Sequence, residues 1–306
     1  MSNTIRKPVS TALALLLAAA SPAAAQVAPG AAGEPVKLAA DLFETVAQVP
    51  VTVPLHGGGN RSGNMIVTHF RPTGAGPFPL VVMSHGRAGD AAGRAKPERQ
   101  RFMNVVRYWV SRGFAIVVPT RLGYGATGVE PDTEASGRCD NRNYGPMSEA
   151  SAHQVRTAVT FGAGLPGIDK QRVVLMGQSV GGLATTVANG KGIPGVVAAI
   201  NVAGGSGGNP SERAANPCGP DRLAGVYRAA GKSAKAPMLW IYAENDKYWG
   251  ATIPRTWHKA YTEAGAKAEF VMLPPVGEDG HRAIDQPPVW TPHVDRFIAS
   301  IGLKKN

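Results

Sequence analysis

Cysteine is scarce in this sequence, which has only Cys139 and Cys218 among its 306 residues. No histidine stands at a ligand-like spacing from either cysteine, so the pattern does not favour a metal site. In an oxidising compartment two such cysteines usually pair, and closing the long loop between them would restrict the unfolded chain by about 4 kcal/mol. We therefore predict one disulfide bond and no bound metal.

Acidic residues and long apolar runs are also few. The chain has 21 aspartates and glutamates against 32 lysines and arginines, a formal net charge of +11. The basic residues form no run with interleaved aromatic residues, so we predict no nucleic-acid partner. No stretch after residue 25 is long enough to cross a bilayer, so we predict no membrane span. The sequence leaves the oligomeric state open.

The first 25 residues have the pattern of a secretory signal peptide. Arg6 and Lys7 precede a short apolar core at 11–20, and a small-residue cleavage site ends at Ala25. We therefore predict a secreted or periplasmic protein. Residues 26–40, rich in alanine, glycine and proline, are predicted to form a flexible lead-in.

Strand-like and helix-like runs alternate along the rest of the chain, which is typical of an α/β protein. Two apolar runs separated by a glycine-rich turn, 49–54 and 65–70, predict an antiparallel pair. Further strands are predicted at 80–84, 114–118, 173–176, 196–202, 238–243 and 269–273, and helices at 102–110, 147–161, 253–264 and 290–298. We predict one domain over 41–306, a doubly wound and mostly parallel sheet with helices on both faces. An irregular loop insertion spans 121–146.

One stretch has the pattern of a nucleophile elbow. An apolar strand at 173–176 leads into Gly177-Gln178-Ser179-Val180-Gly181, and a small-residue helical segment follows. Side chains at the two glycine positions would collide with the tight turn that presents Ser179. The N-terminal end of the helix would stabilise an oxyanion formed beside the serine. We predict Ser179 as a catalytic nucleophile.

A second stretch, residues 204–208 (GGSGG), matches the same pattern around Ser206. It also follows a strand-like run, but Asn209 and Pro210 follow it in place of a helix. Ser206 is therefore interpreted as a flexible loop serine.

The partners of a serine nucleophile are expected in the chain order serine, acid, histidine. The strand at 238–243 is followed by Glu244-Asn245-Asp246, and the strand at 269–273 by a loop that reaches His281. We predict Asp246 as the acid and His281 as the base. Glu244 and Asp279 stay open as alternative acids.

The remaining site predictions concern the oxyanion and the substrate. The amides of Val180 and Arg87 are predicted to bind the oxyanion, the second from the loop after the strand at 80–84. Tyr124, Tyr248 and Trp249 flank the predicted site and are candidates for the substrate pocket. The insertion, pinned through Cys139 and Cys218, would form one wall of this pocket.

Together these motifs resemble the dienelactone hydrolase branch of the α/β-hydrolases, over about residues 49–303. The matching segments are His85-Gly86, 121–125, 177–182, Asp246 and Gly280-His281. The resemblance implies an α/β-hydrolase fold, hydrolysis of esters or lactones, and no metal or organic cofactor. Dienelactone hydrolases use a cysteine nucleophile where this chain has Ser179, which shifts the expected substrates toward those of secreted serine esterases and polyester hydrolases.

The sequence therefore favours a secreted serine hydrolase that cleaves carboxylic esters, small or polymeric, through an acyl-enzyme. Two other classes stay open. The same three residues would also serve a peptidase, an amidase or an acyltransferase. Alternatively, the chain would be an exported binding protein that keeps the fold without catalysis.

Overall fold

The computed structural model describes Met1 and residues 37–303. The predicted signal peptide lies outside the described residues except for Met1, and so does the predicted lead-in up to residue 36. A short 3-10 helix, η1 (Ala40–Leu42), begins where the lead-in was predicted to end. In the described part of the chain, no helix is long and apolar enough to cross a membrane.

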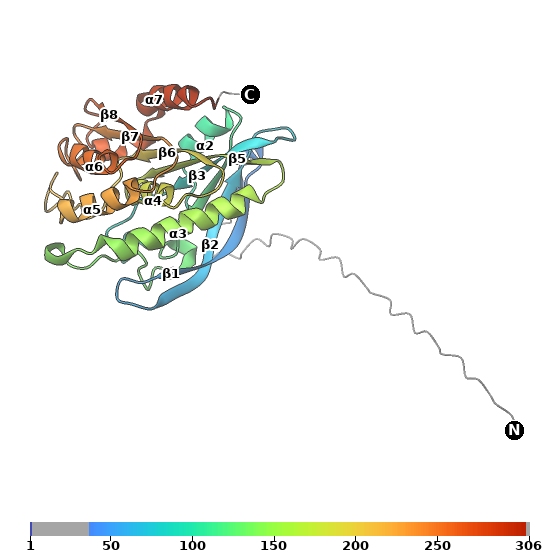
Figure 1. Cartoon of the computed structure of the whole chain (residues 1–306), viewed down its shortest axis with the longest axis horizontal. Helices are drawn as coiled ribbons and strands as arrows, with labels where there is room; N and C mark the ends of the chain where they lie inside the picture. Colours follow the sequence, from blue (N-terminus) through green and yellow to red (C-terminus); the bar gives the residue numbers. More distant parts are fainter. Residues whose placement is uncertain (2–36, 304–306) are drawn as a thin grey trace.

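Eight strands form one sheet in the order β1-β2-β4-β3-β5-β6-β7-β8 (Figure 1). β2 pairs antiparallel with both β1 and β4, and the other neighbours run parallel. The strands are β1 Thr45–Pro54, β2 Asn60–Phe70, β3 Phe78–Ser84, β4 Ala115–Thr120, β5 Ile168–Gln178, β6 Val196–Val202, β7 Met238–Ala243 and β8 Ala268–Leu273. All predicted strands are present. Three of them, β1, β2 and β5, begin before their apolar runs, with polar residues that stay partly exposed.

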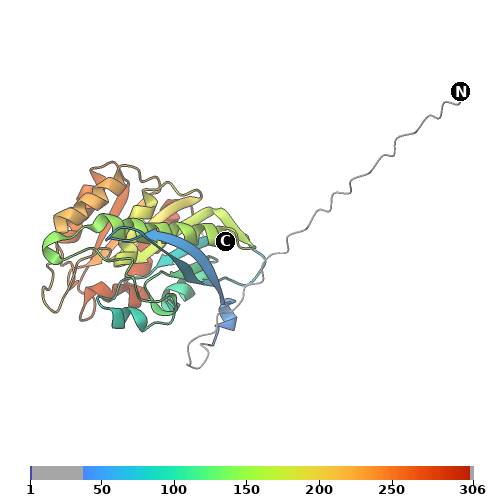
Figure 2. The same cartoon turned by 90° about the horizontal axis from the view of Figure 1, so that it is seen from below.

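Helices cover both faces of the sheet, as predicted (Figure 2). Alternate residues of one strand serve the two cores: Val82 of β3 packs in one core and Val81 in the other. One face carries α3 (Tyr144–Ala163), α4 (Val180–Asn189), α5 (Pro220–Gly231) and α6 (Ile253–Thr262), and the other carries α2 (Met103–Val110) and α7 (Pro287–Ser300). A one-turn helix, α1 (Ala91–Ala95), follows β3.

Helix α5 was not predicted from the sequence. Its core contacts come from Leu223, Ala224 and Tyr227, spread among glycine, aspartate and arginine residues. Because small and charged residues separate these few apolar positions, the helical period is weak in the sequence, and burial against the sheet identifies the helix.

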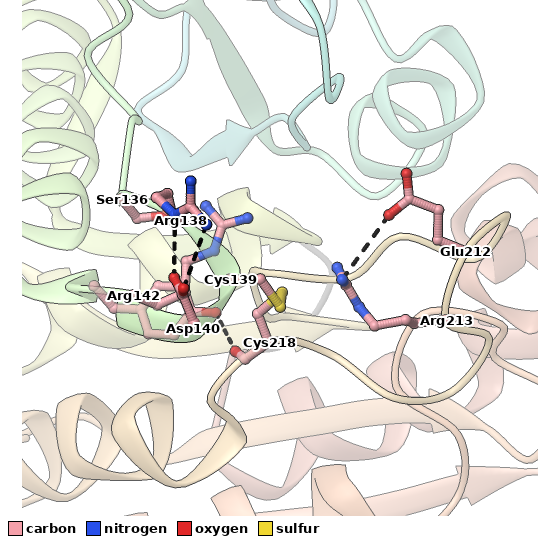
Figure 3. The surroundings of a disulfide bond; sticks show 9 residues. Ser136, Arg138, Cys139, Asp140, Arg142, Glu212, Arg213 and Cys218 are labelled. Atoms are coloured by element: carbon pink, nitrogen blue, oxygen red, sulfur yellow. Dashed lines mark hydrogen bonds and ion pairs between the residues drawn. A yellow bond between two sulfur atoms is a disulfide. The ribbon is translucent and has the colours of Figure 1, made fainter.

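The insertion after β4 runs from residue 121 to 143 and contains two 3-10 helices, η2 (Gly125–Thr127) and η3 (Cys139–Asn141). It ends earlier than predicted because Pro146 lies in the first turn of α3, where proline is tolerated. The predicted disulfide is present: Cys139 of η3 bonds to Cys218, with the two Cα atoms 5.0 Å apart (Figure 3). The insertion is thereby joined to the loop before α5.

Parallel strands place their carboxyl ends at one edge of the sheet, where ligands of such folds bind. Strands β3, β5, β7 and β8 end there at Ser84, Gln178, Ala243 and Leu273. The predicted nucleophile, acid, base and oxyanion residues all follow these four strand ends. The topology therefore brings together loops that are distant in sequence.

Candidate active site

Ser179 lies in a strained backbone conformation between β5 and α4. Its φ is 56° and its ψ is −125°, a region that residues other than glycine rarely adopt. A Cβ at Gly177 would lie 2.1 Å from the Gly181 carbonyl oxygen, and one at Gly181 would lie 2.1 Å from the Ser84 carbonyl oxygen. Any side chain at these two positions would clash with the backbone, so both must be glycine, as the elbow pattern predicts.

The three predicted catalytic side chains meet at this turn. The Ser179 Oγ lies 3.0 Å from His281 Nε2, and His281 Nδ1 lies 3.0 Å from Asp246 Oδ2. All three are buried, with 7% of Ser179, 6% of His281 and 1% of Asp246 exposed. This is the geometry in which a histidine can take the serine proton while a carboxylate orients the imidazole.

The loop after β7 contains Asp246, and two other residues of this loop, Tyr248 and Trp249, contact both Asp246 and His281. Asp246 Oδ1 accepts hydrogen bonds from the amides of Tyr248 at 2.8 Å and Trp249 at 3.1 Å, which leaves Oδ2 for the histidine. The Tyr248 ring stacks on the His281 imidazole with centroids 4.0 Å apart, and Trp249 meets it edge-on at 5.3 Å. The imidazole is thus fixed on two sides as well as by its hydrogen bonds.

Neither alternative acid contacts the imidazole. Glu244 is exposed. Asp279 Oδ1 accepts from the backbone amides of His281 and Lys247, both at 3.0 Å, so it ties the base loop to the acid loop. Asn245 makes a second tie, because its Oδ1 accepts from the Val276 amide at 2.9 Å.

The sequence analysis missed these two ties between the loops. The available signal was residue type, since short Asp and Asn side chains commonly bond nearby backbone in loops. Which loop they would bond could not be deduced before the loops were placed.

The two predicted oxyanion residues both border the same cleft as Ser179. Val180 is the first residue of α4, so its amide precedes the helical hydrogen-bond ladder. Among the described residues, neither the Val180 nor the Arg87 amide has a backbone acceptor. Both amides are therefore available to a ligand, and their role stays a prediction.

The side chain of Arg87 is only 18% exposed. It forms an ion pair with Asp132 of the insertion. Burial acts to lower the pKa of Arg87, but Asp132, Tyr124 and Glu134 together outweigh it and the pKa is raised. The guanidinium is therefore occupied in holding the insertion.

A cleft of about 660 Å³ opens beside Ser179. Its walls come from the loop after β3, the insertion, the loop after β6 and the loop after β7; they include Arg87, Arg142, Arg213, Glu212, Tyr248 and Trp249. Two of the three predicted pocket residues, Tyr248 and Trp249, border this cleft, and their contact with a substrate stays a prediction. In the part of the chain that the structure describes, no three His, Cys, Asp or Glu side chains are grouped to hold a metal ion.

The third predicted pocket residue, Tyr124, does not line this cleft, and the prediction is wrong. Its side chain is 2% exposed, its hydroxyl donates to Glu134, and its ring meets His85 edge-on at 4.5 Å. The buried Glu134 carboxylate needs hydrogen-bond donors, and the Tyr124 hydroxyl is one of them. Tyr124 therefore lies beneath the site and does not form part of the cleft wall.

Ser206, interpreted from the sequence as a flexible loop serine, is closely packed in the structure. Ser206 lies in a loop that borders the cleft, but only 6% of it is exposed, and its Oγ lies 3.5 Å from the Met147 sulfur. The neighbouring Gly205 packs so closely that a Cβ would lie 2.8 Å from the Trp257 ring. Aromatic side chains leave no room for a Cβ at Gly205, Gly207 and Gly208, which explains these glycines. His281 bonds to Ser179 and not to Ser206.

A fully buried ion pair lies beneath the loop after β3. Arg121 donates from Nε to Glu134 Oε1 at 2.6 Å, and both side chains are 0% exposed. Burial acts to raise the pKa of Glu134, but the Arg121 charge and the hydrogen bonds from Arg121 and Tyr124 together outweigh it, and the pKa falls to about 2. Arg121 also donates from Nη1 to the Ser84 hydroxyl at 2.9 Å and the His85 carbonyl at 2.8 Å.

Several solved structures with a similar sheet and helix arrangement are described as hydrolases. They include a protein described as a dienelactone hydrolase from Klebsiella pneumoniae (TM-score 0.53, 18% identity, 84% of this chain and 98% of that one). An acetyl xylan esterase from Paenibacillus sp. R4 is similar over 85% of this chain and 89% of its own (TM-score 0.54, 18% identity). The chain has the α/β-hydrolase fold. The fold prediction is confirmed.

A peptidase is also among the similar α/β-hydrolases. The acylaminoacyl peptidase of Pyrococcus horikoshii matches 85% of this chain but only 42% of its own length (TM-score 0.55, 14% identity). No profile of a protein family matches the sequence, and no curated protein matches it either. The likeness therefore establishes the fold alone.

Proposed function

We propose that this α/β-hydrolase is a secreted or periplasmic serine hydrolase that cleaves carboxylic esters. The observation that carries the proposal is the hydrogen-bonded series Ser179–His281–Asp246, with both contacts at 3.0 Å, at a strained elbow that opens into a cleft. The proposed catalytic domain spans 41–306. The Cys139–Cys218 disulfide and the N-terminal signal pattern support export.

The proposed reaction proceeds through an acyl-enzyme. Ser179 Oγ attacks the ester carbonyl carbon while His281 Nε2 takes its proton, and Asp246 stabilises the resulting imidazolium. The carbonyl oxygen becomes an oxyanion that accepts from the Val180 and Arg87 amides. Collapse of the tetrahedral intermediate expels the alcohol, which takes the proton from His281. Water repeats the sequence and releases the acid, restoring Ser179.

Active-site labelling tests the enzyme assignment. A fluorophosphonate should add to Ser179 and not to Ser206, and Ser179→Ala should abolish both the adduct and p-nitrophenyl ester hydrolysis. Ser233→Ala, at an exposed serine away from the cleft, is the matched control and should label as the wild type does. Folded wild-type protein that takes no label would favour a binding protein without catalysis.

A peptidase is the second candidate, and the similarity to acylaminoacyl peptidase favours stating it. The same triad would cleave an amide if the leaving amine received the His281 proton. Comparing a p-nitrophenyl ester with a peptide p-nitroanilide separates the two. We expect a higher kcat/KM for the ester, and a preference for the anilide would assign a peptidase. Trapping of the acyl group by an added alcohol in preference to water would indicate an acyltransferase.

A further inference from the structure

His85, the first residue after β3, holds its ring in one protonation state. The ring lies with Nδ1 2.7 Å from the Gly86 carbonyl oxygen and Nε2 3.1 Å from the Arg121 backbone nitrogen. A backbone N–H can only donate, so Nε2 is the acceptor and carries no proton. The ring proton is therefore on Nδ1, and it is donated to the Gly86 carbonyl.

The surroundings keep this ring neutral. His85 is 1% exposed, and burial together with the Arg121 charge lowers its pKa to about 3. The titratable groups that face it are Arg121, Glu134 and Tyr124, which form the buried network beneath the site. His85 therefore keeps one tautomer throughout the pH range in which a triad histidine works.

The Gly86 carbonyl carbon, whose oxygen accepts from His85, is bonded directly to the Arg87 nitrogen. The Gly86 carbonyl and the Arg87 N–H belong to one planar peptide group and point in opposite directions. A group that anchors the carbonyl therefore sets the direction in which the Arg87 amide donates.

This peptide lies against the nucleophile elbow. A Cβ on Gly86 would be 2.5 Å from Gln178 Oε1 and 3.1 Å from the Ser179 Cβ. The Arg87 amide is thus beside the serine, and no backbone group among the described residues accepts from it.

We infer that His85 is a positioning residue, which orients the Arg87 amide toward the oxyanion formed at Ser179. The inference rests on the proposed serine hydrolase function. It gives His85 a role distinct from that of a base, since its Nε2 is occupied by the Arg121 amide and its Nδ1 by the Gly86 carbonyl.

Two near-isosteric variants separate the two hydrogen bonds. In His85→Gln the side-chain oxygen can still accept from the Arg121 amide, but no donor remains at the Nδ1 position. In His85→Asn the amide nitrogen takes the place of Nδ1 and can donate to Gly86. We expect His85→Gln to lower kcat about 10- to 100-fold, with KM changed less than about threefold, and His85→Asn to keep most of kcat. A kcat of His85→Gln within about twofold of the wild type would overturn the inference.

A sulfur substitution in the substrate distinguishes an oxyanion effect from general damage to the fold. Sulfur accepts hydrogen bonds weakly, so the ratio of ester to thionoester hydrolysis rates reports on the oxyanion donors. We expect this ratio to fall in His85→Gln and to stay near the wild-type value in His85→Asn. A purely structural role would lower the two rates equally.

A measurement on the wild-type protein needs no variant to fold. With ¹⁵N-labelled histidine, NMR should show His85 as the neutral Nδ1–H tautomer from about pH 5 to 8. An Nε2–H tautomer, or titration near the ordinary histidine pKa, would overturn the inference. If the wild type neither takes a fluorophosphonate nor cleaves an ester, the proposed function itself has failed. An active enzyme that is insensitive to His85→Gln refutes the role of His85 alone.

Discussion

At the scale of single residues, the contacts in the site depend on a few positions where the backbone conformation or the available space restricts the residue type. Ser179 adopts a positive φ, and the glycines on either side of it leave no room for a Cβ. One carboxylate oxygen of Asp246 accepts from two backbone amides, and the other contacts His281. Because each group has a defined partner, single substitutions test the assignment sharply.

Asp246→Asn is expected to lower kcat by about 10³- to 10⁴-fold with little change in KM, because an amide cannot both hold the productive tautomer and stabilise an imidazolium. Steady-state ester hydrolysis measures this. Glu244→Gln is the matched control at the exposed neighbouring carboxylate and should retain wild-type kinetics. The reverse result would move the acid to Glu244.

At the scale of elements, the insertion is tied to the body of the protein at several points. Arg61 of β2 donates to the carbonyl oxygens of Thr127 and Pro131, and Arg94 of α1 pairs with Glu130 at 2.9 Å. The disulfide adds a covalent tie at Cys139. We therefore expect the insertion to act as a fixed wall of the cleft and not as a lid.

Removing the disulfide should weaken both stability and substrate binding. The cysteines are 79 residues apart, and on the chain-entropy model a loop of this length contributes about 4 kcal/mol to the free energy of unfolding. Urea unfolding of Cys139→Ser/Cys218→Ser measures the loss. Because Cys139 borders the cleft, KM should rise more than kcat falls. Unchanged KM in the folded double variant would mean that the arginine contacts alone hold the wall.

At the scale of the whole molecule, charged side chains lie both in the interior and along the cleft. The Arg121–Glu134 pair and the neutral His85 occupy the interior beneath the site, while the chain carries a formal net charge of +11. Arg142 and Arg213 border the cleft on either side of the disulfide (Figure 3). The Arg142 guanidinium donates to the Ser136 hydroxyl at 3.0 Å, and the Arg213 guanidinium lies 3.9 Å from the Glu212 carboxylate. We expect the buried groups to affect stability at low pH and the arginines at the cleft to affect substrate preference.

Stability should fall as the pH is lowered below about 6.5. Burial lowers the pKa of His85 to about 3 and of His69 to about 4, so below pH 6.5 the unfolded chain binds protons that the folded protein does not. His85 alone should contribute a loss of about 3 kcal/mol between pH 6.5 and 4. Glu134, with a pKa lowered to about 2, adds a further loss as the pH falls below 4.5. Urea unfolding at several pH values measures this, and a flat profile would contradict it.

Charge in the cleft should favour anionic esters. An ester whose acyl group ends in a carboxylate should have a higher kcat/KM than its neutral isostere at low salt, because Arg142 and Arg213 attract it. Raising the salt from about 0.02 to 0.5 M should shrink this advantage while leaving the neutral ester nearly unaffected. Arg142→Gln should reduce the preference as well. Equal rates for the two esters at low salt would show that the arginines do not face the substrate.

Most of the fold and the approach of Ser179, His281 and Asp246 to one another could be predicted from the sequence, for local reasons. The strand runs, the elbow around Ser179 and the positions of Asp246 and His281 follow from patterns within a few residues of each strand end. The structure corrects the pocket prediction for Tyr124, because this side chain is buried against His85, which lies on a different loop. Asp279 resembles a candidate acid in the sequence and instead ties two loops together.

Two kinds of information are therefore separable in this protein. The sequence by itself determined which segments form strands, which turn must be glycine-lined, and which residue types follow each strand, because these depend on near neighbours. Only the tertiary structure decided that the imidazole of His281 reaches Ser179, that Arg121 and Glu134 pair in the interior, and that His85 bonds to the Gly86 carbonyl. Such contacts depend on how distant loops approach one another, and packing sets that approach.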